Sequence, residues 1–324
     1  MYTPPFTITD EILRLVAEIS ERIGALSVRL GARMPSPLLR KENQIKTIHS
    51  SLAIEHNSLS LQQVTDVIEG RHVLGAPDEI QEVKNALQAY QLMLSLDAFE
   101  EKDLLRAHKL MMTDLVNNAG QYRKEGVGVF DGDKCIHVAP PADRVPSLMA
   151  ELFEWVRQTD THPLISSCVF HYEFEFIHPF MDGNGRMGRY WQTMLLSRWK
   201  GIFAWLPVET IVKKHQQEYY NAIAQSDAQG DSTVFITFML RCLLQTVKEQ
   251  QKVTDKVTDK VTDKSEGKIL DLIKKNPSIT IPQIMQELSM SDSGVRKVLR
   301  RLQKEWRVVR IGANKNGHWE IVGA

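Results

Sequence analysis

The chain has 324 residues, of which 43% are hydrophobic, and its 40 Lys or Arg balance its 40 Asp or Glu. These values are typical of a globular protein of about two domains and exclude a disordered or fibrous chain. A net charge of zero also excludes a protein that coats nucleic acid or an anionic membrane with its whole surface.

Cysteine usage and the N-terminal sequence predict a cytoplasmic protein with no membrane partner. Cys135, Cys168 and Cys242 are odd in number and widely spaced, which indicates reduced thiols rather than a disulfide framework or a CxxC metal site. The chain begins MYTPPFTITDEILRLV and lacks the basic start and continuous apolar run of a signal peptide. The sequence contains no run of about 18 apolar residues, so no membrane span is predicted.

Most of the chain is predicted to be helical. Thr9 and Asp10 form an N-cap signal ahead of apolar residues at helical spacing, namely Ile12, Leu13, Val16, Ile19 and Ile23. Further helices are expected over 43–56, 60–69, 77–97, 101–116, 143–158, 162–176, 185–199, 207–226 and 231–250. The exception is 123–138, where short β-branched runs flank Asp131-Gly132-Asp133 and predict a β-hairpin.

Residues 252–263 repeat a four-residue unit, KVTDKVTDKVTD. Thr and Asp are unfavourable inside helices, and the segment has too little apolar surface for a core. We therefore expect a solvated linker over 251–264, or a frayed extension of the preceding helix.

The last 60 residues, 265–324, differ from the rest in charge and pattern. They contain eleven Lys or Arg against six Asp or Glu, so this segment is about +5 and the first 264 residues are about −5. The pattern of this segment predicts a winged helix-turn-helix. It consists of a helix around Ile269–Ile273, a second after Thr280, a third capped by Ser291 or Ser293, and two strands at 308–311 and 319–322.

The third helix of this segment is expected to be basic on its outer side. Such a helix suits contacts with DNA phosphates, whereas other winged helices bind proteins, and both interpretations remain open. The DNA-binding candidates are Arg296, Lys297, Arg300, Arg301 and Lys304.

The most informative segment is HPFMDGNGRMGR, residues 178–189. Its glycine-rich turn, 183–185, leads into a predicted helix, whose free N–H groups and dipole favour phosphate. Arg186 and Arg189 lie one helical turn apart, so both guanidinium groups can reach the same anion. Asp182 suits a Mg²⁺ ion that bridges phosphates, and His178 is a candidate general base.

This segment resembles the signature of the Fic family, HxFx(D/E)GNGRxxR, with every specified position filled. Gly120–Arg123, the predicted hairpin and 137–149 add to the resemblance, which extends over roughly 45–245. It implies a helical core with a β-hairpin flap, and transfer of AMP from ATP to a Tyr, Thr or Ser hydroxyl of a target protein or of the chain itself. Pyrophosphate would be released.

The resemblance also implies a role for individual residues. His178 would be the catalytic base, Asp182 would bind Mg²⁺, and Phe180 would pack inward and position the loop. The flap residues Ile136, His137 and Val138 would dock the target. The residues implied to contact the nucleotide are Asp182, Gly183, Asn184, Gly185, Arg186, Met187, Gly188, Arg189, Tyr219 and Tyr220.

A second motif, Ser51-Leu-Ala-Ile-Glu55, resembles the family's inhibitory helix, (S/T)xxxE(G/N). Glu55 would pair with Arg189 in place of the γ-phosphate of ATP, since a carboxylate and a phosphate compete for the same donors. His56 departs from the motif, because Gly or Asn is usual there. The family also implies a homodimer.

The expected fold class is mainly α, with a hairpin flap and a small C-terminal α+β domain. Two other functions fit the same residues: a DNA-binding regulator that uses the Fic core as a nucleotide sensor, and an enzyme that removes AMP or uses another nucleotide or phosphocholine donor. The expected parts are a helical region at 1–100 with the inhibitory helix at about 45–57, a Fic core at 101–250, the linker at 251–264 and the winged helix at 265–324.

Overall fold

The computed structural model describes residues 2–30, 37–131, 134–304, 307–312 and 317–322. The chain is mainly helical and has two small antiparallel sheets in the part described. It divides into two compact units, Met1–Glu249 and Gln250–Ala324.

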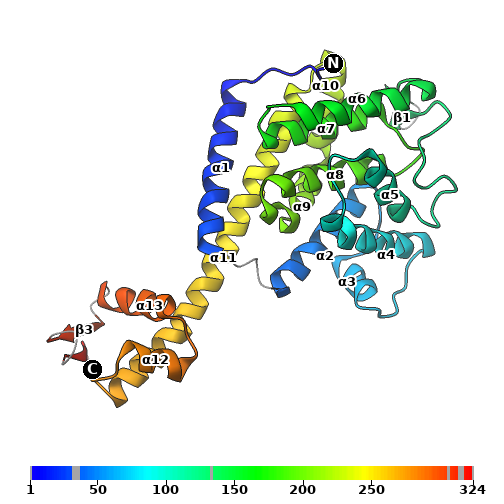
Figure 1. Cartoon of the computed structure of the whole chain (residues 1–324). Helices are drawn as coiled ribbons and strands as arrows, with labels where there is room; N and C mark the ends of the chain where they lie inside the picture. The colour runs from blue at the N-terminus through cyan, green and yellow to red at the C-terminus, as the bar shows by residue number, and fades with distance from the viewer. Residues whose placement is uncertain (1, 31–36, 132–133, 305–306, 313–316, 323–324) are drawn as a thin grey trace. The chain divides into compact units, whose positions relative to one another are not determined.

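The first unit consists of helices with one β-hairpin (Figure 1). Short 3₁₀ helices occur at Met93–Ser95, Ala142–Arg144 and Gly201–Trp205. The α-helices are α1 (Asp10–Leu30), α2 (Pro37–Ile54), α3 (Leu61–Ile68), α4 (Pro77–Leu92), α5 (Glu101–Met111), α6 (Val145–Gln158), α7 (Pro163–Ile177), α8 (Asn184–Trp199), α9 (Val208–Lys214), α10 (Gln216–Gln229) and α11 (Thr233–Lys275).

Two adjacent helices, α7 and α8, form the centre of the first unit. Nearly every side chain of both helices is buried, including Phe170, Phe174 and Trp191. A helix that is buried on all sides belongs to the core of a protein rather than to its surface. The turn that joins α7 to α8 is therefore fixed at the ends of the two most enclosed helices.

The helix α1 lies beside the first part of α11 (Figure 1). The predicted N-cap is confirmed, since the Ile12 N–H donates to Thr9 Oγ1 at 3.2 Å. Ile12 and Ile19 are buried as expected, but Leu13 is 55% exposed. Arg241 Nη2 lies 2.7 Å from Glu11 Oε1 and ties the two helices together at the surface.

Several predicted helix boundaries are wrong. The helix expected over 207–226 is two helices, α9 and α10, which meet at His215. The helix expected over 101–116 ends at Met111, and the one expected to begin at residue 43 begins at Pro37. Ends of helices depend on tertiary contacts that local patterns do not contain.

The segment expected to be a linker or a frayed extension of the preceding helix, 251–264, is helical and lies within the continuous helix α11. The segment contains no proline, and residues on both sides of it are helical. Extending an existing helix costs far less than starting one, so a segment of modest helix propensity continues the helix of its neighbours.

The predicted hairpin is confirmed as β1 (Gly128–Asp131) and β2 (Lys134–Val138), which are antiparallel. The register changes between Val129 and Phe130. The turn residues 132–133 lie outside the described residues, as do the side chains of Ile136 and His137. Val138 ends β2 with a side chain that is 77% exposed.

The second unit is a winged helix domain, as predicted. It contains the last part of α11 followed by α12 (Ile281–Leu288), α13 (Asp292–Lys304) and the antiparallel strands β3 (Val308–Ile311) and β4 (His318–Ile321). Ser291 caps α13, since its Oγ accepts from the Gly294 N–H at 3.2 Å. Its core includes Ile269, Ile273, Ile284, Leu299, Leu302 and Trp319.

Cys168 and Cys242 have free, buried thiols, and burial raises the pKa of both. The Cys135 side chain lies outside the described residues. No described helix is both long and apolar enough to cross a bilayer.

Candidate functional site

His178 directly follows α7 and has left-handed backbone geometry, with φ 49° and ψ 60°. Residues other than glycine adopt this conformation at a cost and often at functional sites. Its Nδ1 lies 3.3 Å from the Glu175 carbonyl oxygen. Because a carbonyl can only accept, this contact places the proton on Nδ1 and leaves Nε2 as the basic nitrogen.

Arg123 holds the loop that carries His178. Its side chain is buried and donates to the carbonyl oxygens of His178 at 2.7 Å, Glu125 at 2.9 Å and Pro140 at 2.5 Å. Its backbone N–H donates to the Pro179 carbonyl at 2.9 Å. Burial lowers the pKa of this guanidinium. Glu125 precedes the hairpin and Pro140 follows it, so one side chain joins the base of the flap to the loop.

His108, on α5, supports the same loop from another side. The Gly120 N–H donates to His108 Nδ1 at 2.8 Å, so Nε2 carries the proton and donates to the Asp182 carbonyl at 3.0 Å. The ring stacks on Phe180 with 3.6 Å between ring centres. Burial lowers the pKa of His108 to about 4, so this hydrogen-bonding pattern is stable at neutral pH. The predicted inward packing of Phe180 is confirmed, since its side chain is fully buried.

Asn184 and Gly183 shape the start of α8. Asn184 Oδ1 accepts from the Phe180 N–H at 2.9 Å, and Asn184 Nδ2 donates to the Phe180 carbonyl at 2.9 Å. Gly183 has a φ of 84°, and a Cβ there would lie 2.7 Å from Met112 Sδ. Only glycine both adopts this positive φ without strain and leaves the space next to Met112 free of a Cβ. The N–H groups at the start of α8 are thus presented at the turn.

Arg186 and Asp182 contact each other across the turn. Arg186 is buried, and its Nη2 donates to Asp182 Oδ1 at 2.9 Å while its Nη1 donates to Glu82 Oε1 at 2.7 Å. Asp182 Oδ1 also accepts from the Gly183 N–H. The Asp182 side chain is 56% exposed, so its carboxylate lies on the open rim of the turn.

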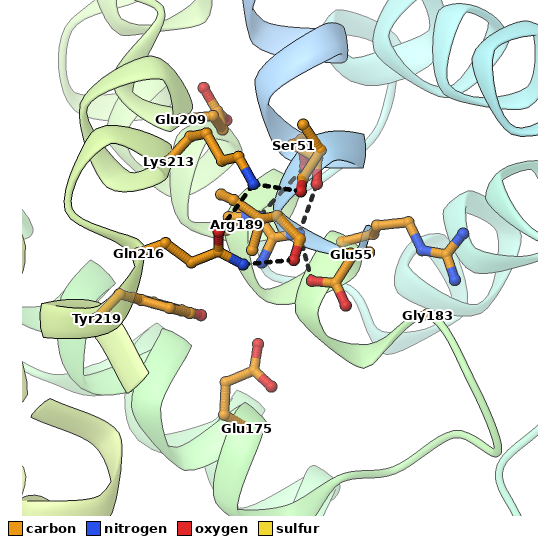
Figure 2. A network of polar contacts seen from close by, with 12 residues as sticks. Ser51, Glu55, Glu175, Gly183, Arg189, Glu209, Lys213, Gln216 and Tyr219 are labelled. Atoms are coloured by element: carbon orange, nitrogen blue, oxygen red, sulfur yellow. Dashed lines mark hydrogen bonds and ion pairs between the residues drawn. The ribbon is translucent and has the colours of Figure 1, made fainter. Parts of the chain in front are cut away.

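Arg189 is in contact with both predicted inhibitory residues of α2 (Figure 2). Its Nη2 donates to Glu55 Oε1 at 2.7 Å and to the Ser51 carbonyl at 3.0 Å, and its Nε donates to Ser51 Oγ at 3.2 Å. A Cβ on Gly185 would lie 2.4 Å from Glu55 Oε1. The Glu55 carboxylate therefore lies over the first turn of α8, where an anion is most favoured.

The end of α2 explains the Gly or Asn that is usual after Glu55. His56 has a φ of 70°, its N–H donates to the Ala53 carbonyl at 3.3 Å, and the Asn57 N–H donates to the Leu52 carbonyl at 3.1 Å. This is a Schellman motif, which requires a left-handed residue and favours glycine or asparagine at the position of His56. Glu55 is thus the cap residue of the helix.

Two further carboxylates near Arg189 were not predicted from the sequence. Glu175 Oε1 lies 3.6 Å from His171 Nε2 and 2.7 Å from where a Cβ on Gly188 would be. Glu209, on α9, accepts from Tyr90 Oη at 3.3 Å, and burial raises its pKa to about 6. Burial opposes protonation of Arg189, but Glu55 and other nearby groups raise the pKa of its guanidinium, which stays charged.

Four of the residues implied to contact the nucleotide also make contacts within the protein. The Met187 side chain is fully buried, and Gly188 adjoins His171 and Glu175. Tyr219 is buried, with its Oη 3.1 Å from His171 Nε2. Tyr220 Oη donates to the Ile54 carbonyl of α2 at 3.1 Å.

In the second unit, the predicted DNA-binding residues do not all share one surface. Lys297, Arg300 and Lys304 are exposed, and the exposed Arg296 pairs with Asp292 at 2.6 Å. Arg301 Nε lies 3.2 Å from Oε1 of the buried Glu266, so this half-exposed side chain pairs with a carboxylate of the same unit. A groove of about 560 Å³ lies beside α13, and its lining includes Thr280, Arg296, Arg300, Arg310 and Trp319.

A sequence model described as the Fic/DOC family matches residues 96–196, and one described as winged helix-turn-helix DNA-binding matches residues 262–305. The crystal structure of a Fic family protein from Desulfovibrio desulfuricans G20 is 45% identical and has a TM-score of 0.74, covering 100% of this chain and 99% of that one. Fic-1 from C. elegans is 18% identical with a TM-score of 0.61, covers 76% of this chain and 73% of that one, and indicates the fold alone.

The matches to curated relatives extend over only part of the length of each relative. A protein from Aedes aegypti named protein adenylyltransferase Fic is 28% identical over 230 residues, which are 67% of this chain and 44% of that protein. One of the same name from Drosophila mojavensis is 27% identical over 239 residues, 69% of this chain and 44% of that protein. This chain thus spans less than half the length of these relatives.

The left-handed His56 leads to a prediction about stability. In His56→Gly the backbone strain is relieved, which outweighs the entropy that glycine adds to the unfolded chain. We expect the thermal midpoint to rise by about 1–3 °C, as measured by calorimetry. His72→Gly is the control, because His72 is exposed and has no left-handed backbone. A midpoint lower than that of this control would contradict the assignment of strain to His56.

Arg123 leads to a second prediction. Arg123→Met leaves buried carbonyl groups without donors, so we expect a loss of about 2–4 kcal/mol in the free energy of unfolding in urea. Arg123→Lys should recover only part of it, since one ammonium group cannot span the same acceptors. Lys124→Met, which removes the same charge from the exposed neighbour, should stay within about 0.5 kcal/mol of wild type. Equal losses in both methionine variants would refute the bridging role.

Proposed function

Since the chain belongs to the Fic family, we propose that it is a protein adenylyltransferase, which moves AMP from ATP to a Tyr, Thr or Ser hydroxyl of a target protein or of itself. The proposal is best supported by one arrangement. A basic nitrogen of His178, two buried guanidinium groups and the amino end of α8 converge on a single turn.

The chemistry follows from these groups. His178 Nε2 accepts the proton of the target hydroxyl as its oxygen attacks the α-phosphorus of ATP. The bond from the α-phosphorus to the oxygen bridging to the β-phosphate breaks, and pyrophosphate leaves with that electron pair. Arg186, Arg189 and the α8 N–H groups would stabilise the charge on the phosphates. Positioning and charge neutralisation provide most of the catalysis in such transfers.

The residues present fit a Mg²⁺ ion held jointly with ATP. The described residues contain no group of three or more side chains able to form a metal site alone. Asp182 offers one carboxylate on the rim of the turn, and Mg²⁺ commonly takes one or two carboxylates with substrate phosphates as its remaining ligands. Asp182 would hold the ion, which would neutralise phosphate charge.

Glu55 is proposed to restrain the enzyme. Glu55 occupies the Nη2 donor of Arg189 at 2.7 Å, and a γ-phosphate at this guanidinium would compete for that donor. The carboxylate also covers the start of α8, so both anions compete for one place. The backbone of Ile136–Val138, in a two-stranded sheet, is proposed to pair with an extended segment of the target.

The winged helix is proposed to bind DNA through the exposed basic residues of α13. Lys297, Arg300 and Lys304 support phosphate contacts, and the match to a DNA-binding family model agrees with them. A protein-binding role for this unit would give no retention on DNA.

Label transfer from α-labelled ATP with Mg²⁺ tests the enzyme proposal. With a cell lysate as a source of targets, Glu55→Gly should raise protein labelling about tenfold or more, because Arg189 is released. His178→Ala should lower it at least about 100-fold. Glu42→Gly is the control, since Glu42 is exposed on the same helix, α2. Absence of label in every variant would reject the proposal.

Retention of the full chain on duplex DNA tests the second proposal. Arg300→Ala should weaken binding and lower the slope of log affinity against log salt by about 1, as expected for one lost phosphate contact. Arg301→Ala, which breaks the pair with Glu266, should reduce thermal stability and leave that slope unchanged. Equal salt slopes for wild type and Arg300→Ala would exclude Arg300 from the interface.

A further inference from the structure

The carbonyl end of α2 is held by side chains outside the phosphate-binding turn. The last carbonyl groups of a helix have no partner within the helix. In α2, the Schellman motif provides backbone donors for the carbonyls of Leu52 and Ala53. The carbonyls of Ala53 and Ile54 accept additional hydrogen bonds from α9 and α10.

Three side chains supply these additional donors, and two of them, Lys213 and Gln216, are labelled in Figure 2. Lys213 Nζ donates to the Ala53 carbonyl at 2.6 Å. Gln216 Nε2 and Tyr220 Oη donate to the Ile54 carbonyl at 2.9 and 3.1 Å. Lys213 Nζ also donates to Gln216 Oε1 at 2.8 Å, so the donors are linked to one another.

Charge adds to the strength of this contact. The carbonyl end of a helix is the negative end of its dipole, and Lys213 places a positive charge there. Hydrogen bonds from a charged donor are stronger than those between neutral groups. Lys213 is half-buried, which reduces screening by solvent.

Helices α2 and α9 are also in contact one turn before the end of α2. Ser50 Oγ lies 3.2 Å from Thr210 Oγ1, between α2 and α9. Lys213 and Gln216 are outside 178–189, and their side chains form hydrogen bonds with α2, with each other and with Tyr220. Removing either side chain thus weakens the hold on α2 without removing a phosphate ligand.

We propose that Lys213, Gln216 and Tyr220 form a latch that keeps α2 docked and thereby keeps Glu55 on Arg189. The inference rests on the proposed function and adds a regulatory element to it. Lys213 and Gln216 act as positioning residues of the inhibitory helix. When their bonds to Ala53 and Ile54 break, Glu55 leaves Arg189 more often, and the phosphates of ATP gain access to that guanidinium.

The test uses full-length wild type, Lys213→Met, Glu55→Gly and the double variant. Lys214→Met is the matched control, because Lys214 is the exposed neighbour with the same charge. Two quantities are measured: hydrogen exchange of the backbone amides at 52–57, and label transfer from α-labelled ATP. Exchange reports on the docking of α2 whether or not the chain transfers AMP.

Lys213→Met should accelerate exchange at 52–57 and raise label transfer about tenfold, as expected for one lost charge-assisted hydrogen bond. Lys214→Met should match wild type in both measurements. In the Glu55→Gly background, Lys213→Met should change label transfer less than about twofold, because both changes act on the same inhibitory contact between Glu55 and Arg189. Gln216→Leu, compared with Gln217→Leu, provides a second pair if Lys213→Met does not fold.

The latch is refuted if exchange at 52–57 is unchanged in Lys213→Met and Gln216→Leu, or if transfer rises equally with and without Glu55. Failure of Glu55→Gly to transfer label has a different meaning. It would reject the adenylyltransferase proposal, and the exchange rates would then decide the latch by themselves.

Discussion

The buried charge of Arg189 is the constraint on which the rest of the site depends. Its side chain is only 3% exposed, and an unpaired charge in a protein interior costs several kcal/mol. Ser51 on α2 and Glu55, which caps that helix, supply the contacts that offset this cost. Under the proposed function, a phosphate group that binds at the start of α8 would compete with Glu55 for this one guanidinium.

The turn around this charge is held mainly through its backbone. Arg123, His108 and Asn184 all bond to main-chain atoms of the segment from Ile177 to Asp182. Such contacts fix the path of the chain and leave the side chains of that segment available for chemistry. The two buried helices α7 and α8 provide the rigid base. The positions of His178 and of the α8 N–H groups are thus set before any ligand arrives.

How much was predictable depended on whether the contacts are local in sequence. His178, Asp182, Arg186 and Arg189 lie within one short motif, so their proximity followed from their closeness in sequence and, for the two arginines, from helical spacing. The contacts of Arg123 with His178 and of Arg189 with Glu55 join residues 55 and 134 positions apart, and no local pattern contains them. Resemblance to a family indicated the second contact and gave no role for Arg123. The tyrosines at 219 and 220 could not be assigned from sequence, because aromatic residues on a helix look the same in a core and in a ligand site. Likewise, the propensities of 251–264 describe an isolated segment, whereas its helical neighbours decide its structure.

The place of Glu55 as the cap residue at the end of α2 has a consequence for how the proposed inhibitory contact would open. Helices open from their ends, and such local openings cost far less free energy than unfolding or moving a whole helix. Glu55 therefore need not wait for α2 to move as a rigid body, since fraying of the final turn is sufficient. The strength of the proposed inhibition would then depend on one helix terminus, and small changes there would adjust it while the packed length of α2 and the core beneath it stay as they are.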